Sequence, residues 1–311
     1  HLVYTSHLSW LTVLSSDVLP HVMLLVDDPI DRQKIDGCQG ATQEDAVNIA
    51  AVKHGIIEYV YAIRDTLRKL YDTELMQGGG HIRGYAVEGE AAKQVTEAFA
   101  AKQNSCGGFL FAVGDGNHSL ATAKTCWENI KKSGKFTEEQ LKTHPARHAL
   151  VEICNLHSEA LEFKPIHRLL TNVDVKDMLS FFEAEITKQG LESAEGDEIV
   201  FEYVESGATS IKNSGINITN RGDRLPVEIL QGILDKYLET HGNVEIDYIH
   251  GDEALHGLVK ETKGCGIFLQ SIDKSTLFPA INAGGVLPRK TFSIGEANEK
   301  RYYMECHKIS M

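Results

Sequence analysis

The residues best suited to chemistry in this chain form the run Gly114-Asp115-Gly116-Asn117-His118-Ser119, which follows the apolar stretch 107–113. An apolar strand that ends in a glycine-flanked carboxylate and leads into a helix is typical of phosphate binding. The free N–H groups and the positive end of the helix dipole then face the loop, and glycine lets the backbone approach a ligand closely. The pattern therefore predicts an anion-binding loop.

The polar residues of this loop have distinct expected roles. Asp115 is a candidate metal ligand, because Mg²⁺ usually takes one or two carboxylates together with phosphate oxygens. Asn117 and Ser119 can donate hydrogen bonds to phosphate, and His118 can serve as a phosphate donor or a general base. The same letters also fit a tight strand-to-helix turn in which Asp115 and Asn117 only cap the backbone.

A second candidate segment lies near the C-terminal end of the sequence. Arg289, Lys290 and Thr291 follow two loop glycines and Pro288, and two cations with a hydroxyl can receive the anionic oxygens of a substrate or nucleotide. A third candidate is His81, which follows three glycines whose N–H groups could cradle phosphate. The alternative for both segments is an ordinary solvated turn, and this alternative is stronger for the glycine run before His81.

Histidines flank one further cation, Arg147. His144 and His148 lie four residues apart, a spacing that would place two zinc ligands on one helix face. Pro145 and the strand-like run that follows disfavour a helix, so we expect a loop at the edge of the anion site instead. Four cations are expected to converge on one anion-binding cleft: Arg83, Arg147, Arg289 and Lys290.

Composition narrows the class of protein. The chain has 311 residues, with 31 Lys+Arg against 44 Asp+Glu, so 31 − 44 gives a net charge of −13. An acidic chain is a poor match for a nucleic-acid partner, which requires a basic surface. The apolar stretches are too short for a membrane span. Six scattered cysteines with no C-x-x-C pair indicate buried, reduced thiols and a cytoplasmic protein.

The elements that must position these residues follow from hydrophobic periodicity. Predicted strands cover 19–26, 82–87, 107–113, 148–156, 199–204, 244–249, 266–270 and 302–309. Predicted helices cover 42–71 (one helix, or two broken at Gly55), 90–103, 119–133, 173–189 with Asp174 as its cap, 226–238, 252–259 and a stretch after Asp273. Residues 205–223 suit a hairpin or surface loop. Trp127, Phe181 and Phe182 occupy helical apolar positions and are expected in the core.

This alternation favours an α/β to α+β fold with mixed sheets. At roughly 100 to 200 residues per domain, the length suggests about two domains. We expect a main domain over 1–222 that carries the loop, and a smaller C-terminal α/β domain over 223–311 that carries the Leu287–Phe292 segment.

Several motifs together resemble the bacterial and archaeal family called domain of unknown function 1015. They are VGDGNHSLATAK, HPARHALVEICNLH, ALEFKPIHRLL, IDYIHGDEAL and GVLPRKTFSIGEANEKRYYMECHKI. The resemblance runs from about Leu19 onward. Because family members usually carry a longer N-terminal region, it implies a shortened form.

The family's D-G-H-H-R motif resembles a signature of the ParB and sulfiredoxin-like superfamily, which includes a free-serine kinase. It falls on Asp115–Ser119, and the resemblance implies a strand-turn-helix loop that binds nucleotide phosphates. Asn117 and Ser119 depart from the motif, and Ser119 removes a bidentate Arg clamp. A Pro-x-Lys-[Ser/Thr] segment of the family matches Pro288, Lys290 and Thr291.

The resemblance implies a Mg²⁺-dependent phosphoryl transferase that uses ATP or ADP and acts on a small hydroxylated metabolite. Asp115 would hold Mg²⁺, His118 would orient or deprotonate the acceptor hydroxyl, and Arg289 with Lys290 would stabilise charge on the transferred group. The alternative is a non-catalytic nucleotide or anion sensor that has lost the Arg clamp. A third reading, a ParB-like DNA-associated protein, is disfavoured by the acidic charge.

Overall fold

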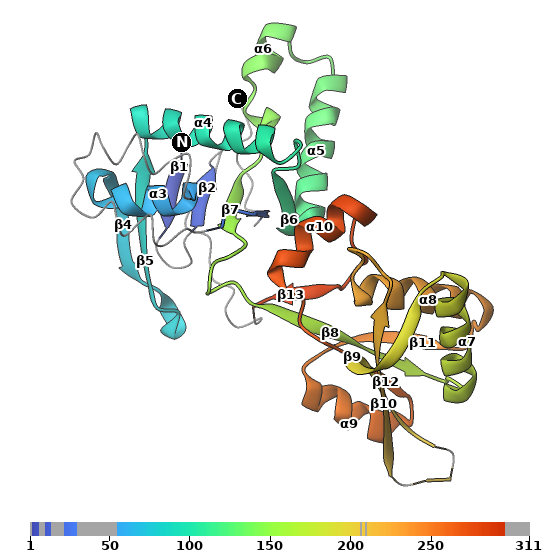
Figure 1. Cartoon of the computed structure of the whole chain (residues 1–311). Helices are drawn as coiled ribbons and strands as arrows, with labels where there is room; N and C mark the ends of the chain where they lie inside the picture. Colours follow the sequence, from blue (N-terminus) through green and yellow to red (C-terminus); the bar gives the residue numbers. More distant parts are fainter. Residues whose placement is uncertain are drawn as a thin grey trace. The chain divides into compact units, whose positions relative to one another are not determined.

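The computed structural model describes residues 2–5, 10–13, 22–29, 55–205, 207–208 and 210–295. It divides into two compact units, the first drawn from residues 1–161 and the second spanning Glu162–Gly295 (Figure 1). The sequence placed the boundary after residue 222 instead. The difference arises because the strands between 163 and 219 pair with strands that follow them in the chain.

A mixed sheet of seven strands forms the framework of the first unit: β1 Leu2–Thr5, β2 Trp10–Val13, β3 Met23–Val26, β4 Arg68–Glu74, β5 His81–Val87, β6 Phe111–Asp115 and β7 Val151–Asn155. Their order is β4-β5-β1-β2-β7-β3-β6. β3 and β7 run parallel, whereas β3 and β6 run antiparallel. β6, which leads into the predicted anion loop, therefore lies at one edge of this sheet.

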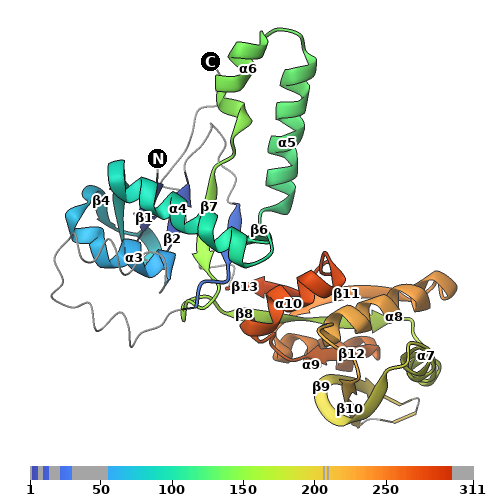
Figure 2. The same ribbon diagram turned by 45° about the horizontal axis from the view of Figure 1, so that its top comes forward.

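Two helices, α3 Ile56–Ile63 and α4 Gly89–Ser105, cover this sheet. They share one hydrophobic cluster with β5 and β7, in which Val60, Val95 and Ile153 are buried. Figures 1 and 2 show both helices over the sheet of the first unit. α4 confirms the helix predicted at 90–103.

The long helix predicted over 42–71 is wrong in its last part. After α3 the chain forms a short 3₁₀ turn at Arg64–Thr66 and then enters β4, which pairs with β5. Leu67 fits helical spacing, but pairing with a neighbouring strand overrides so weak a local signal. Residues 42–54 lie outside the described residues.

The helix predicted after the loop is confirmed as α5 Asn117–Lys132. None of its residues is buried. Trp127 is half-exposed, so the prediction that it belongs to the core is wrong. The Trp127 ring lies 5.8 Å from that of His144 and the Lys131 ammonium is 5.6 Å from its centroid. A short helix, α6 Glu138–Thr143, and a 3₁₀ turn at Pro145–Arg147 then lead back to β7.

An antiparallel sheet forms the framework of the second unit: β8 Phe163–Thr171, β9 Glu192–Val204, β10 Ile211–Thr219, β11 Glu245–His250 and β12 Cys265–Leu269, with β13 Phe292–Ile294 pairing with part of β8. The order is β10-β9-β12-β8-β11. The predicted hairpin or loop at 205–223 contains β10, which forms a hairpin with β9. β8 was not predicted, because the polar residues His167 and Arg168 interrupt its apolar pattern.

Helices α7 Val175–Lys188, α8 Pro226–Thr240 and α10 Lys274–Gly284 contribute to the main core of this unit, and α9 Asp252–Thr262 packs on a separate cluster with Leu169. The sequence predicted all four helices. Asp174 caps α7 as expected, since its Oδ1 accepts hydrogen bonds from the N–H groups of Lys176 and Asp177. Phe182 is buried as predicted, and Phe181 is partly buried against the same core.

The cysteines of the described residues are all free, but only half fit the prediction of buried thiols. Cys154 and Cys265 are buried, and burial raises the pKa of Cys265 to about 12. Cys106 and Cys126 are exposed. The strand predicted at 302–309, Cys38 and Cys306 lie outside the described residues. No helix in the described ranges combines the length and apolar character needed to cross a bilayer.

Candidate functional site

The end of β6 is shaped by a β-bulge at Gly114. Met23 of β3 pairs with Asp115, whereas the next residue, Leu24, pairs with Val113, so Gly114 is an extra residue on the β6 side. A bulge bends its strand and redirects the side chains beside it, and bulges are common next to functional sites. Here the bulge sets the direction of Asp115 at the last position of the strand.

Gly116 converts the strand into a helix. Its backbone is left-handed, with φ 86° and ψ 19°, a conformation that glycine adopts without the steric cost of a Cβ. The carbonyl of Gly116 accepts the first intrahelical bond, from the N–H of Leu120 at 2.9 Å. The N–H groups of residues 117–119 therefore precede the hydrogen-bonded ladder of α5.

The start of α5 carries no compensating negative charge of its own. Gly116 supplies no side-chain cap, and the first turn holds no acidic residue, whereas Lys131 and Lys132 lie in the last turn. Free N–H groups and the helix dipole make such an end favourable for an anion. The strand, turn and helix predicted from the sequence are present, and anion binding by this loop stays a prediction.

The side chains of the loop differ in exposure. Asp115 is half-buried, and its Oδ1 accepts a 2.7 Å hydrogen bond from the N–H of Gly116, which tightens the turn. Asn117 and His118 are exposed, and Ser119 is half-buried in the first turn of the helix. All of them lie on one continuous strand-turn-helix segment, as expected.

A second carboxylate, Glu152, shares the sheet row of Asp115 and was missed from the sequence. Met23 pairs with Asp115 on one side and with Glu152 of β7 on the other. Paired residues project from the same face, and two strand spacings separate their Cα atoms by about 9 to 10 Å. The signal available in the sequence was a lone acidic residue inside the apolar run Ala149–Leu156.

His81 and Arg83 are not brought to this loop. They lie on β5, five strand positions from β6, which corresponds to roughly 24 Å across the sheet. Both side chains have carboxylate partners on β4 instead. His81 contacts Asp72 through Nε2 and Glu74 through Nδ1 at 2.7 Å, and Arg83 Nε lies 3.3 Å from Asp72 Oδ1.

These contacts shift the pKa values of the hairpin in opposite directions. Hydrogen bonds to Glu74 and Asp72 raise the pKa of His81, because they favour the charged imidazolium. Lys69, followed by His81, holds the pKa of Asp72 far below its usual range. The interactions form a charged network on the β4–β5 hairpin, where Asp72, Glu74 and Arg83 are exposed.

Arg147 lies beside the second half of α5. The neighbouring His144 is buried, accepts a 3.1 Å hydrogen bond from the N–H of Ala146 at Nδ1, and packs near Trp127. Trp127 is ten residues beyond Asn117, about 15 Å along the helix. Arg147 itself is exposed and donates to the carbonyl of Lys142 at 3.0 Å. The predicted place of Arg147 at the anion loop is therefore not supported.

Arg289, Lys290 and Thr291 belong to the second unit. Arg289 and Lys290 are exposed, and Lys290 has a left-handed backbone with φ 58°. Thr291 is buried, and its hydroxyl donates to the carbonyl of Pro288 at 2.7 Å, so this hydroxyl closes its own turn. Their convergence with the Asp115–Ser119 loop stays a prediction.

The chain belongs to the family described as protein of unknown function (DUF1015), whose model matches residues 46–227. The match contains the whole Gly114–Ser119 segment and ends before Arg289. A comparison with curated proteins gives no match.

Several solved structures share a low level of similarity with this chain. A conserved hypothetical protein from Pyrococcus furiosus is 15% identical, with a TM-score of 0.38 over 60% of this chain and 71% of that chain. A free serine kinase in complex with AMP is 12% identical, with a TM-score of 0.39 over 91% and 89%. A mutant of a free serine kinase in complex with ADP is 10% identical, with a TM-score of 0.38 over 91% of each chain. No residue role in this chain follows from likenesses of this size.

Proposed function

We propose that the Asp115–Ser119 loop binds the phosphate groups of ATP or ADP, and that the chain transfers a phosphoryl group to a small hydroxylated metabolite. The observation that carries this proposal is the uncapped start of α5 behind the left-handed Gly116. The choice of a nucleotide follows from the resemblance of the D-G-N-H-S motif to the superfamily signature. The loop geometry supports anion binding in general. The motif resemblance makes ATP and ADP the first anions to test.

The residues present fit a magnesium ion that is held mainly by the nucleotide. Among the described residues no group of three or more His, Cys, Asp or Glu is arranged to hold a metal. Mg²⁺ often binds through one or two carboxylates plus phosphate oxygens and waters, and Asp115 and Glu152 would supply such carboxylates. When bound, the ion would neutralise charge on the phosphate oxygens.

The chain's own residues would act by positioning and by proton transfer. The N–H groups of 117–119 and the hydroxyl of Ser119 would orient the phosphate oxygens. His118 is exposed at the tip of the loop, where its imidazole could take the proton of an acceptor hydroxyl. Arg289 and Lys290 remain proposed donors to the transferred group.

A specific observation also favours the sensor alternative. The first turn of α5 contains no cation other than a protonated His118, because Ser119 stands where the family motif has Arg. A loop that binds phosphate through backbone N–H groups can recognise an anion, yet it lacks the guanidinium that would stabilise charge developing during transfer. Binding without turnover is the outcome expected of a sensor.

Calorimetric titration with ATP and ADP, with and without Mg²⁺, tests the loop directly. Gly116→Ala forces a side chain into the left-handed region and should weaken nucleotide binding about tenfold or more, because the N–H groups of the loop lose their alignment. Gly134→Ala is a matched control, since Gly134 follows the other end of α5 with a similar φ of 66°. Equal binding by both variants would remove the loop from the site.

Product formation separates the two functions. The wild-type chain is incubated with ATP, Mg²⁺ and a panel of small hydroxylated amino and organic acids, and phosphorylated product is measured. Asp115→Asn should abolish the Mg²⁺-dependent part of binding and turnover. Nucleotide binding without product supports the sensor, and the absence of nucleotide binding by the wild-type chain would reject both functions.

A further inference from the structure

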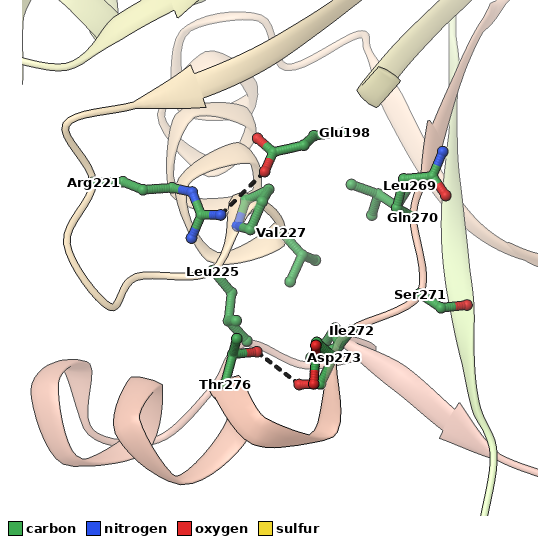
Figure 3. A pocket seen from close by; sticks show the side chains of 11 residues that line it. Glu198, Arg221, Leu225, Val227, Leu269, Gln270, Ser271, Ile272, Asp273 and Thr276 are labelled. Atoms are coloured by element: carbon green, nitrogen blue, oxygen red, sulfur yellow. Dashed lines mark hydrogen bonds and ion pairs between the residues drawn. The ribbon is translucent and has the colours of Figure 1, made fainter. Parts of the chain in front are cut away.

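A small cavity of about 190 Å³ opens in the second unit, between the first turns of α8 and α10 and the end of β12 (Figure 3). This is about the volume of six water molecules and lies below the range of pockets for drug-sized ligands. The cavity therefore suits a ligand of about six to eight non-hydrogen atoms. Its lining lies wholly within the second unit and includes no residue of the Asp115–Ser119 loop.

The floor of this cavity is apolar. Leu225, Val227 and Leu269 line it and are members of the main hydrophobic core, with Ile272 packed against the same core. Water forms no hydrogen bonds with such a surface. An apolar ligand that covers the surface gains about 25 cal/mol of binding free energy per Å² of apolar area removed from water. The floor thus favours a ligand with an aliphatic group.

One wall carries a fixed guanidinium. Arg221 is held by three hydrogen bonds, from Nε to the carbonyl of Ile218, from Nη1 to the carbonyl of Arg224 and from Nη2 to Glu198 at 3.0 Å. Arginine has five N–H donors, so each terminal nitrogen keeps one more. Figure 3 shows the guanidinium directed toward Glu198 at the wall of the cavity.

The charge around the cavity limits the ligand further. Glu198 is already engaged, with Oε1 bound to Arg221 and Oε2 accepting the N–H of Ile218 at 2.9 Å. Asp273 adds a second carboxylate on the opposite side, where it caps α10 through the N–H of Ser275. Two negative groups disfavour a dianion such as a phosphate ester. A monoanion with a planar head matches the remaining guanidinium N–H groups.

The start of α8 adds one more hydrogen-bond donor that favours an anion. Leu225 is the N-cap of this 15-residue helix and Pro226, without an N–H, is its first residue; no side chain caps the helix. The N–H of Val227 consequently has no partner within the helix. It lies beside the cavity that Val227 also lines.

We propose that this cavity binds a small aliphatic monocarboxylate, with the carboxylate on Arg221 and the first turn of α8 and the hydrocarbon chain on Leu225, Val227, Leu269 and Ile272. The site is an additional ligand site of the second unit. It requires no nucleotide and no phosphoryl transfer.

The test uses 3-methylbutanoate as the probe and its amide, 3-methylbutanamide, as the matched neutral compound. Amide resonances of the full chain are followed by NMR during titration of each compound. The carboxylate should shift the resonances of Val227, Ile272 and Thr276 and bind about tenfold or more tightly than the amide, because a hydrogen bond to a charged group is lost in the amide. Equal binding of both compounds, or shifts confined to other residues, would overturn the proposal.

Two variants make the test independent of any one substitution. Thr276→Phe places a ring at the exposed rim of the cavity and should abolish the titration. Thr187→Phe is the control, because Thr187 is likewise exposed on a helix of this unit, with its hydroxyl bonded to the carbonyl of Glu183. Arg221→Lys keeps the charge but loses the planar fork, and should weaken the carboxylate more than the amide. Unchanged binding in Thr276→Phe would reject the site.

Discussion

The carboxylate of Asp28, two residues after β3, accepts a 2.6 Å hydrogen bond from the backbone N–H of Ile56, the first residue of α3. The N–H of Ile57 donates to the same oxygen at 3.2 Å, and Lys102 of α4 lies 3.4 Å from the other. The helix has a glycine at its N-cap, which has no side chain to offer. A distant residue therefore performs the capping that an Asp or Ser would perform locally.

Asp28→Ala should destabilise the first unit by about 1 to 2 kcal/mol, the usual cost of losing a helix cap, because two backbone N–H groups lose their acceptor. Urea unfolding followed by circular dichroism measures the loss. Asp27→Ala is the neighbouring control, since Asp27 is half-buried and its Oδ1 lies 2.6 Å from Nε2 of His157, away from the helix start. A similar loss in both variants would contradict the capping role.

The cap of α3 also shows where sequence reasoning ends. Asp174 caps α7 from the position directly before the helix, and that local pattern predicted it. Asp28 is 28 residues from Ile56, and no local pattern connects them. In the same way the sequence predicts the loop at Asp115, but the bulge at Gly114 and the row shared with Glu152 depend on strand register.

β8 illustrates a different limit. Arg168 is fully buried, a rare state for arginine, so its charge argues against a buried strand in the sequence. In the fold, Nε donates to Gln231 at 3.1 Å, Nη1 donates to the carbonyl of Ile166, and the guanidinium lies 5.1 Å from the ring of Tyr248. These tertiary partners cannot be deduced from a linear sequence.

Replacing Gln231 alone should lower the free energy of unfolding more than replacing both Arg168 and Gln231. Gln231→Leu leaves the buried Arg168 without its Nε acceptor, which should lower the free energy of unfolding by about 1 to 3 kcal/mol. Arg168→Met with Gln231→Leu should recover part of that loss, because a buried polar pair can often be replaced by apolar side chains at little cost. Denaturant unfolding measures the stability of both variants. A double variant less stable than Gln231→Leu would contradict the prediction.

The stability of the second unit should depend on His167. Its Nδ1 accepts the N–H of Leu269 at 3.2 Å and its Nε2 lies 2.8 Å from Asp252, so the neutral ring fits this environment. Burial lowers the pKa of His167, with Arg168 and His250 acting in the same direction and Asp252 opposing them. Over the pH range between the folded and the unfolded pKa, His167 is therefore protonated in the unfolded chain and neutral in the folded chain.

This lowered pKa fixes the sign of the pH effect. Stability from His167 is present above the ordinary histidine pKa of about 6.5 and is lost as the pH falls from there toward the folded value. His167→Gln should lower stability at pH 7.5 yet remove that part of the decline between about pH 6.5 and 5. His148→Gln is the matched histidine substitution in the first unit, outside the surroundings of His167. Parallel slopes in wild type and His167→Gln would refute the assignment.

The β4–β5 hairpin should titrate in the opposite sense. Because Glu74 and Asp72 raise the pKa of His81, the imidazolium persists above the usual histidine range, and its contribution is lost as the pH rises through the folded pKa. Asp72→Asn should move the His81 pKa down toward its ordinary value, since one carboxylate partner becomes neutral. Asp65→Asn is the control, because Asp65 is an exposed aspartate before β4 that pairs with Arg64. NMR titration of the His81 ring protons measures both shifts. If Asp72→Asn left the His81 pKa unchanged, Asp72 would not contribute to the raised pKa of His81.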